Sequence, residues 1–367
     1  MKLNELLMNS ANKYVEFQKE DGSFLSGHNG PYRDSETPVR NTAHMLFLFS
    51  NLYNVSKSQV YKNVANKALD YLMSEAARPT KHTFYHREKK GKDKCNGLVG
   101  QAWCIEALVA ASEALGRSDS YKLAEEVYLL HRFDSEIGIW NRMDVDGSQL
   151  GFDATFNHQL WFSASASMLK KTPEAQSDVG IFLDKVAVNV STYPNNVIYH
   201  SSPMGRVISY SKFGLKPLLS EVKSRIGKSL PSRKAGMYSK SVGYHGFNMY
   251  AFAMLKEQLP EHGIWNLDLM GRLLEPCKSD EFRHDLRHSV FGYFYNVSGI
   301  ELAYAYEVLL GDKHESTQWL QLQLDNTWLN AVDPLSANVI DINTARSRLY
   351  AAVRLRNDYV LNAPNPI

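Results

Sequence analysis

The sequence has few cysteines, no long apolar run and almost no net charge. Its cysteines, Cys95, Cys104 and Cys277, are odd in number and far apart. That pattern argues against a disulfide framework or a zinc-ligand spacing and favours a reducing compartment. No stretch approaches the roughly 18 apolar residues of a membrane span, and the N-terminal segment lacks the apolar core of a signal peptide. We therefore expect a cytoplasmic protein without a membrane span.

Charge and short motifs exclude further classes. Net charge is +2 and charged residues make up 22% of the chain, with both signs interleaved. A nucleic-acid-binding face would need concentrated basic residues, and the one basic run, 86–94, is typical of a solvated loop. The chain has no Gly-rich phosphate loop, no G-x-S-x-G element and no HExxH motif. We expect no cofactor, and the sequence does not indicate an oligomeric state.

Helical periodicity is what the sequence does contain. Apolar residues make up 44% of the 367 residues, and no series of alternating strands is evident. The apolar-periodic segments tend to pair, a nearly uncharged helix being followed by a more amphipathic one. They lie near 2–18, 38–54, 57–76, 97–115, 119–131, 153–170, 175–191, 215–227, 241–258, 264–275, 297–311, 315–330 and 343–356.

The pairing predicts a specific architecture. Many of the uncharged helices follow a loop of Gly, Asp, His and aromatic residues, such as 138–151 or 281–296. A chain of helical hairpins with apolar inner helices and polar loops at their N-terminal ends predicts an all-α, (α/α)6-type toroid. The loops would gather at one mouth of the ring, where converging helix N-termini favour anions. No Pro/Gly/Ser linker divides the chain, so we expect a single domain over residues 1–367.

Aromatic residues are abundant, with 20 Tyr, 16 Phe and 6 Trp, and many lie in the polar loops. Such loops suit sugars, whose C–H faces stack on rings while their hydroxyls form hydrogen bonds; a large aromatic core is the alternative. Near the first loop, Arg40 and His44 share one helical face at a spacing of four residues. They are candidates for substrate binding, although capping and an Arg–Asp bridge would also explain this cluster.

Residues 97–103, GLVGQAW, contain a second candidate element. It resembles the GQAW element in an inner helix of unsaturated glucuronyl hydrolases, which are (α/α)-barrel enzymes. In that family a nearby Asp performs acid/base catalysis, and the resemblance implies Asp93 for this role here. Asp146 and Asp153 are further candidates for a hydrolase. Close helix packing alone would also explain the glycines.

Residues 151–168, GFDATFNHQLWFSASASM, form a third element. A helix with so little charge is usually buried, so Asn157 and His158 at its start are either satisfied internally or face a ligand. Asn157-His158 followed by Trp161 and Ala164 resembles the NNH-x-x-W-x-A element of alginate lyases, which also have an (α/α) toroid fold. Phe156 stands where that family has a first Asn.

The lyase resemblance implies a chemistry. In such lyases the Asn neutralises the uronate carboxylate and the His acts beside a Tyr. Removing the C5 proton of a uronate is slow unless the charge of the enolate-like intermediate is offset, and an acid and a base must flank the ring. Tyr244-His245 also opens an apolar helix, as a Tyr-His pair does in these lyases, and would supply the catalytic Tyr and a substrate-binding neighbour.

A further cluster, 283–296, contains Arg287, Tyr293 and Tyr295. These residues suit a carboxylated sugar. Arg binds carboxylates in bidentate fashion, and Tyr both stacks on a sugar ring and donates a hydrogen bond. His284 and His288 lack a third ligand, so we expect no metal site. The segment has the composition of a loop.

The leading hypothesis is an enzyme that cleaves an acidic, uronate-containing glycan by β-elimination. Asn157, His158 and Tyr244 would be catalytic, and Arg40, His44, Trp140, Trp161, His245, Arg287, Tyr293 and Tyr295 would bind substrate. Three alternatives remain: a glycoside hydrolase of the unsaturated glucuronyl type, using Asp93, Asp146 or Asp153; a sugar epimerase on the same toroid; and a non-catalytic glycan-binding toroid in polysaccharide assembly.

Overall fold

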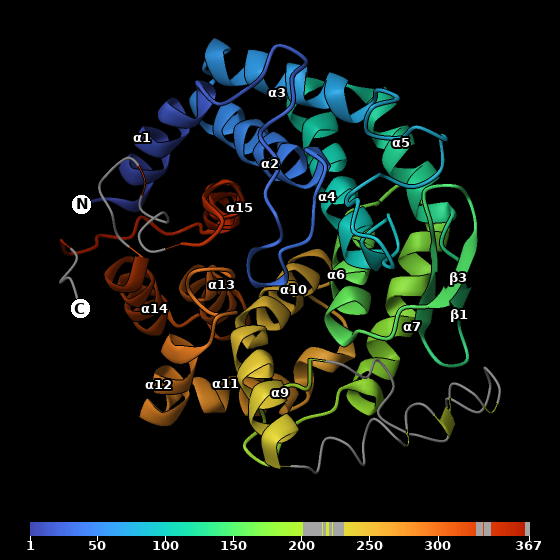
Figure 1. The fold of residues 1–367 in the computed structure, drawn as a ribbon. Helices are drawn as coiled ribbons and strands as arrows, with labels where there is room; N and C mark the ends of the chain where they lie inside the picture. The colour runs from blue at the N-terminus through green and yellow to red at the C-terminus, as the bar shows by residue number, and fades with distance from the viewer. Residues whose placement is uncertain are drawn as a thin grey trace.

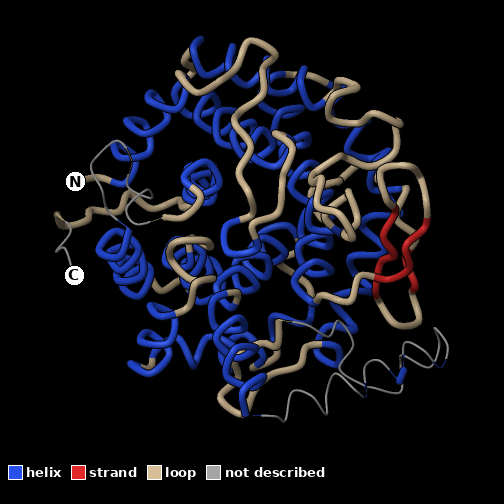
Figure 2. Tube along the Cα trace, viewed as in Figure 1, coloured by secondary structure: helices blue, strands red, loops and turns tan. Residues whose placement is uncertain are grey.

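The computed structural model describes residues 1–200, 231–327 and 339–363, together with the single positions 215, 218, 219, 222 and 333. Its helices form two concentric rings, which confirms the expected all-α (α/α)6 toroid (Figure 1). Long loops cross one end of the inner ring (Figure 2). The predicted segment 215–227 lies almost wholly outside the described residues.

The inner ring is closed. It consists of α2 (Val39–Ser56), α4 (Gly97–Leu115), α6 (Phe156–Ala166), α10 (His245–Gln258), α13 (Ser298–Ala305) and the 3-10 segment η6 (Arg348–Arg354). Each of these packs on the next one along the chain, and η6 returns to α2. The short helix α15 (Ile342–Ser347) leads into η6 and also contacts α2.

The outer helices confirm the predicted pairing. The outer elements are α1 (Leu3–Val15), α3 (Gln59–Leu72), α5 (Ser118–Leu129), α7 (Pro173–Asn189), α9 (Pro231–Gly243), α11 (Leu269–Leu274), α12 (Asp280–His288) and α14 (Lys313–Thr327). Within the described ranges α3 packs on α2, α5 on α4, α7 on α6 and α14 on α13, while α1 contacts η6.

Helix α4 shows why the inner helices are apolar on every side. Every residue from Gly97 to Ala111 is buried, because α2, α3, α5 and α6 surround the helix. By length and composition α4 would also suit a membrane span, yet 78% of its most apolar window is buried within the protein. Packing inside the toroid therefore accounts for its composition.

Two local predictions are wrong. Residues 133–152 form a small antiparallel sheet of β1 (Phe133–Asp134), β2 (Ile139–Met143) and β3 (Gln149–Phe152), where no strands were expected. The strands are only two, five and four residues long, so they carry little alternation. The expected loop over 283–288 belongs to α12, whose first turn is capped by the Ser279 hydroxyl accepting from the Phe282 N–H.

Buried ion pairs connect the inner segments. Arg354 of η6 donates to Glu106 of α4 at 2.6 Å, and Arg348 of η6 pairs with Glu301 of α13. A third buried pair, Arg40 with Glu36 at 3.2 Å, lies at the start of α2. Burial raises the pKa of Glu106 above its usual value despite the opposing charge of Arg354. Removing one partner from such a pair leaves a desolvated charge uncompensated.

Replacing Glu106 with Ala should therefore lower the free energy of unfolding by about 3 kcal/mol or more, because it leaves Arg354 buried without a counter-charge. Glu275→Ala is the control, since it breaks the exposed Lys278–Glu275 pair and should cost less than about 1 kcal/mol. Urea unfolding followed by circular dichroism measures both. Equal losses in the two variants would contradict this account of ring stability.

Candidate functional site

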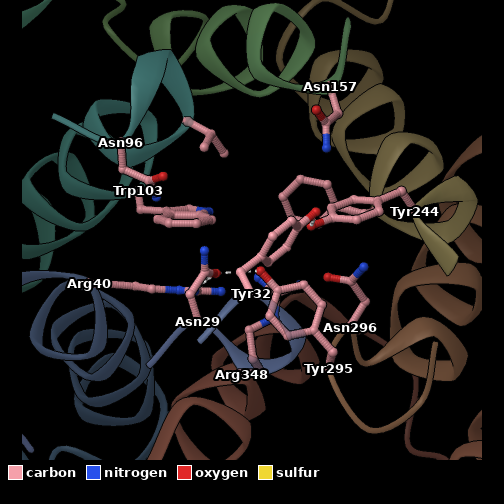
Figure 3. Close-up of a pocket in the computed structure, with 12 residues that line it drawn as sticks. Asn29, Tyr32, Arg40, Asn96, Trp103, Asn157, Tyr244, Tyr295, Asn296 and Arg348 are labelled. Atoms are coloured by element: carbon pink, nitrogen blue, oxygen red, sulfur yellow. Dashed lines mark hydrogen bonds between the residues drawn. The ribbon is translucent and has the colours of Figure 1, made fainter. Parts of the chain in front are cut away.

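A cavity lies where the inner helices begin. Its lining includes Arg40, Asn157, Tyr244 and Tyr295, four residues predicted from sequence, and the open space is about 360 Å3, including the part in contact with solvent. In Figure 3 the side chains of Arg40 and Trp103 lie opposite those of Tyr244 and Asn296. The structure thus places the N-terminal ends of several inner helices around one site, as the toroid predicts.

Arg40 forms one wall and is held rigidly. Its guanidinium donates to Asn29 Oδ1 at 2.8 Å and to Glu36 Oε1 at 3.2 Å, and it lies 4.5 Å from the centre of the Trp103 ring. Asn29 adopts a left-handed conformation, with φ 58°, that turns its side chain towards Arg40. The Tyr295 hydroxyl donates to the same Asn29 oxygen at 2.6 Å. Glu36 offsets the charge of Arg40 within the protein.

Arg348 is a cavity residue that the sequence did not reveal. It is buried, lies 5.2 Å from the centre of the Phe247 ring and pairs with Glu301. Burial raises the pKa of Glu301 to about 7, although Arg348 opposes that shift. The Nε and Nη1 atoms of Arg348 have no hydrogen-bond partner in the described part of the chain. No local motif marks this arginine, because its partners come from distant helices.

Tyr244 forms the opposite wall within a tyrosine cluster. Its hydroxyl lies 2.9 Å from that of Tyr32, and the Tyr244 and Tyr295 rings meet edge to face at 6.1 Å. Burial, followed by the neighbouring tyrosines, raises the pKa of Tyr244 well above its ordinary value. Tyr244 is therefore a neutral hydroxyl at physiological pH, able to donate a hydrogen bond.

Asn157 projects into the cavity from the first turn of α6 (Figure 3). It is buried, and its Oδ1 has no partner among the residues that the structure describes. A buried amide oxygen without a partner is costly, which is typical of a group that meets a ligand. The sequence left two interpretations of Asn157, a group satisfied internally and a group that faces a ligand, and this observation favours the second.

His158 and Asp153 form a hydrogen-bonded pair beside Asn157. His158 Nδ1 lies 2.8 Å from Asp153 Oδ2, and the same carboxylate accepts the Leu98 N–H in the first turn of α4 at 3.0 Å. Burial alone would raise the pKa of Asp153, but His158, Arg142 and that N–H lower it to about 2. Asp153 lies three residues before α6 and does not cap it, because the N-cap is Thr155.

Gly97 makes room for this pair. Its φ is +60°, and a Cβ there would lie 2.5 Å from Asp153 Oδ2 and 2.7 Å from His158 Nδ1. Its neighbour Asn96 lines the cavity, whereas Asp153 and His158 lie against Gly97 and are not among the lining residues. His158 keeps 24% of its side-chain surface exposed. A carboxylate on Nδ1 fixes the imidazole and leaves Nε2 for proton transfer.

His200 is a second histidine near the site, after His158, and sequence analysis did not identify it. Its ring lies 4.3 Å from that of Tyr244, and its Nδ1 is buried without a partner among the described residues. Burial, then the charges of Lys240 and His158, hold the pKa of His200 well below its usual value. His200 is therefore neutral and near both Tyr244 and His158.

Several predicted residues lie in the core instead. Trp161 stacks on Phe247 and donates to its carbonyl at 2.9 Å, and Trp140 is fully buried with its indole N–H donating to the Tyr128 hydroxyl. His245 lies between two backbone groups, Ile198 N–H and Leu273 carbonyl. These positions do not line the cavity, since apolar helices enclose them.

His44 supports the cavity wall from behind. It stacks on Tyr350 at 4.3 Å, meets Trp103 edge to face and contacts the Ser347 hydroxyl. Burial, then Arg348 and Arg40, hold its pKa well below the usual value. His44 thus positions the Trp103 wall and does not itself line the cavity.

The remaining predicted residues are not brought to the cavity. Arg287 is exposed at the end of α12, and Tyr293 is buried near it. Asp146 is exposed in the turn between β2 and β3 and accepts from Ser148. Asp93 is held by Arg87 at 2.9 Å and Arg142 at 3.1 Å, and its pKa lies below the usual value because these charges outweigh burial.

Within the described ranges, no group of three or more His, Cys, Asp or Glu residues could hold a metal ion. His284 and His288 lie on α12 with their rings 4.3 Å apart, but no carboxylate or thiol completes a site there. The absence of a metal or cofactor in function stays a prediction.

Comparison of the sequence with known proteins shows the family of the chain. The chain is 38% identical over 366 residues to archaeal glycosylation protein Q of Haloferax volcanii, an alignment that covers 97% of this chain and 98% of that protein. The chain belongs to the archaeal glycosylation protein Q family. No protein-family model matches it.

Solved structures similar to this member of the glycosylation protein Q family are (α/α) toroids of carbohydrate enzymes. Cellobiose 2-epimerase from Bacillus thermoamylovorans superposes with TM-score 0.63 at 12% identity, covering 96% of this chain and 98% of that one. A sugar epimerase from a ruminal bacterium gives 0.61 at 11%, with the same coverage. A GH76 α-1,6-mannanase of Salegentibacter gives 0.53 at 10%, covering 95% and 97%. At these identities the likeness shows the fold alone.

The Asp153 pKa makes stability depend on pH. Because its folded pKa of about 2 lies below the unfolded value of about 3.9, Asp153 stabilises the fold above pH 4, and this contribution is lost as pH falls towards 2. Between pH 5 and pH 2, the wild-type free energy of unfolding should fall by about 2 kcal/mol more than that of Asp153→Asn. Parallel losses in both proteins would contradict the assignment. Glu75→Gln, at an exposed position, should behave as wild type.

Proposed function

We propose that the chain is a sugar epimerase of a glycosylation pathway, which removes a proton from a sugar carbon and returns one to the opposite face. The observation that carries this is the Asp153–His158 hydrogen bond. His158 follows Asn157, which lines the cavity together with Tyr32 and Tyr244, whose hydroxyls form a second pair. These groups supply an oriented base next to the cavity lining, a neutral donor and a polar amide.

The chemistry follows from these groups. His158, oriented by Asp153 through Nδ1, would take the proton of a C–H bond that an adjacent carbonyl or carboxylate has acidified. The electron pair left behind delocalises onto that group as an enolate, and Asn157 with the Arg348 N–H groups would stabilise the charge. Tyr244, or His200 through Tyr244, would return a proton to the other face, so the substrate gains and loses one proton and its mass is unchanged.

The relatives support this choice. The relative at 38% identity is named a glycosylation protein, and two toroids similar in fold are named sugar epimerases. The hydrolase alternative finds less support in the site. Asp93 is engaged by two arginines, Asp146 is exposed in a hairpin, and Asp153 has a pKa of about 2, which suits a fixed carboxylate better than a proton donor.

A β-eliminating lyase is the second candidate, because Asn157 and Tyr244 line one cavity as the lyase resemblance implies. The first step would be the same proton removal by His158. The two reactions differ in the fate of the enolate, since a lyase expels the substituent two carbons from the carbonyl or carboxylate carbon, whereas an epimerase reprotonates the ring.

Solvent exchange tests the proposal even while the product is unidentified. In D2O the protein should incorporate deuterium at one carbon of its substrate, and a panel of neutral sugars, uronic acids and their glycosides can be followed by NMR. His158→Gln and Tyr244→Phe should each slow incorporation by about 100-fold or more, the usual contribution of a general acid or base. His284→Gln, on the exposed surface of α12, is the control and should exchange as wild type.

Mass spectrometry separates the candidates. An epimerase leaves the mass unchanged in ordinary water, a lyase yields an unsaturated fragment lighter by one water than the hydrolytic product, and a hydrolase adds water across the bond. Exchange that persists in His158→Gln would remove His158 from the mechanism. Binding of a sugar with no exchange and no new product across the panel would favour a non-catalytic toroid.

A further inference from the structure

Lys240, near the end of α9, occupies an unusual position for a lysine. Its ammonium lies 4.8 Å from the centre of the Tyr32 ring, 5.5 Å from that of Phe291 and 5.9 Å from that of Tyr244. Tyr32 and Tyr244 line the cavity, so the ammonium sits at its edge against the tyrosine pair. Cation–π contacts attract the charge, but no described residue accepts a hydrogen bond from this half-buried ammonium.

The other cations around the site already have carboxylate partners. Arg40 pairs with Glu36, Arg348 with Glu301, and Lys92 donates to both oxygens of Asp34 at 2.9 and 2.7 Å. By contrast, no carboxylate in the described part of the chain pairs with Lys240. It is the cation near the cavity whose charge the described residues leave uncompensated.

A second lysine lies close to Lys240. The ammonium of Lys92 lies 5.4 Å from the Tyr32 ring, so two lysines share one aromatic side chain. Burial, then the charge of Lys92, lowers the pKa of Lys240 to about 8. Because Asp34 already offsets the charge of Lys92, Lys240 is the ammonium of the two that a bound anion would neutralise.

We infer that Lys240 binds an anionic substituent of the substrate, a carboxylate or a phosphate, at the edge of the cavity beside the Tyr32 and Tyr244 hydroxyls. This inference rests on the proposed function, because it assigns the substrate of that cavity to acidic sugars. Lys240 would supply the counter-charge, and the hydroxyl of the pair that does not donate to the other would donate a hydrogen bond to the anion. Lys240 would then determine specificity and fix one end of the sugar beside Tyr244.

Lys240 also predicts how binding depends on pH. Only the ammonium form attracts an anion, so affinity should fall as pH rises through about 8. The groups facing Lys240 are Tyr32, Tyr244, Lys92 and His200. Burial raises the pKa of both tyrosines and lowers that of His200, so these three do not titrate near pH 8. Lys92 remains paired with Asp34.

Calorimetric titration of the full-length protein at pH 7 with glucuronate, glucose 6-phosphate and glucose provides the test. At least one anion should bind more tightly than glucose, and whichever does identifies the substituent as carboxylate or phosphate. Lys240→Gln should weaken binding of that anion by about tenfold or more, the effect of losing a charge-assisted hydrogen bond. It should leave glucose binding unchanged. Lys278→Gln, at an exposed position of the 3-10 turn 275–278, is the matched control.

Lys240→Arg separates charge from shape. It keeps the positive charge at alkaline pH, so it should retain anion binding and abolish the loss of affinity between pH 7 and pH 9. Unchanged anion affinity in Lys240→Gln, or no preference of the wild-type protein for either anion over glucose, would overturn the inference. These binding outcomes are independent of the exchange assay on His158→Gln, so failure of the proposed reaction and failure of the anion site are distinguishable.

Discussion

Closure of the inner ring between α2 and η6 is the constraint on which the site depends. The two segments lie about three hundred residues apart in the chain, and Ser347 joins them through hydrogen bonds with Asn41 and His44. This contact brings Arg348 to the cavity and keeps His44 behind Trp103. Each wall of the cavity comes from a different helix, so no wall has its position until the ring is complete.

Among the described residues, Arg40, Arg348 and Arg354 of the inner ring are each paired with a buried glutamate. Arginines paired with glutamates keep their N–H donors in fixed positions but add little net attraction for an anion. Such pairs stabilise weakly and are costly to break, which suits a scaffold for polar recognition. A lysine outside these pairs, such as Lys240, would then attract an anion strongly, because no carboxylate among the described residues offsets its charge.

Much of the fold was predictable because helical periodicity is local. Apolar inner helices such as 97–115 and the polar loops before them indicated the toroid, and the starts of those helices indicated where Asn157, Tyr244 and Arg40 would meet. The sheet was missed because strands as short as Phe133–Asp134 carry no periodic signal. Trp161 and Trp140 were misplaced because an aromatic ring in a core and one in a sugar site look alike in sequence.

The residues that sequence analysis missed share one property. Arg348 and His200 acquire their environment only from distant segments, through Glu301 and Tyr244 respectively. No short motif could mark them. The pairing of Asp153 with His158 could be predicted only in part. The two residues are five positions apart, which is close enough for motif analysis, but the turn between them must be known.

The left-handed glycine at position 97 has a consequence for how this family can vary. A methyl group there would occupy the space of the Asp153 carboxylate and the His158 ring. Any homologue with a larger residue at the aligned position must therefore have moved or lost that pair. Residue 97 thus provides a criterion, legible in an alignment alone, for deciding which members of the family share this chemistry and which have kept only the toroid.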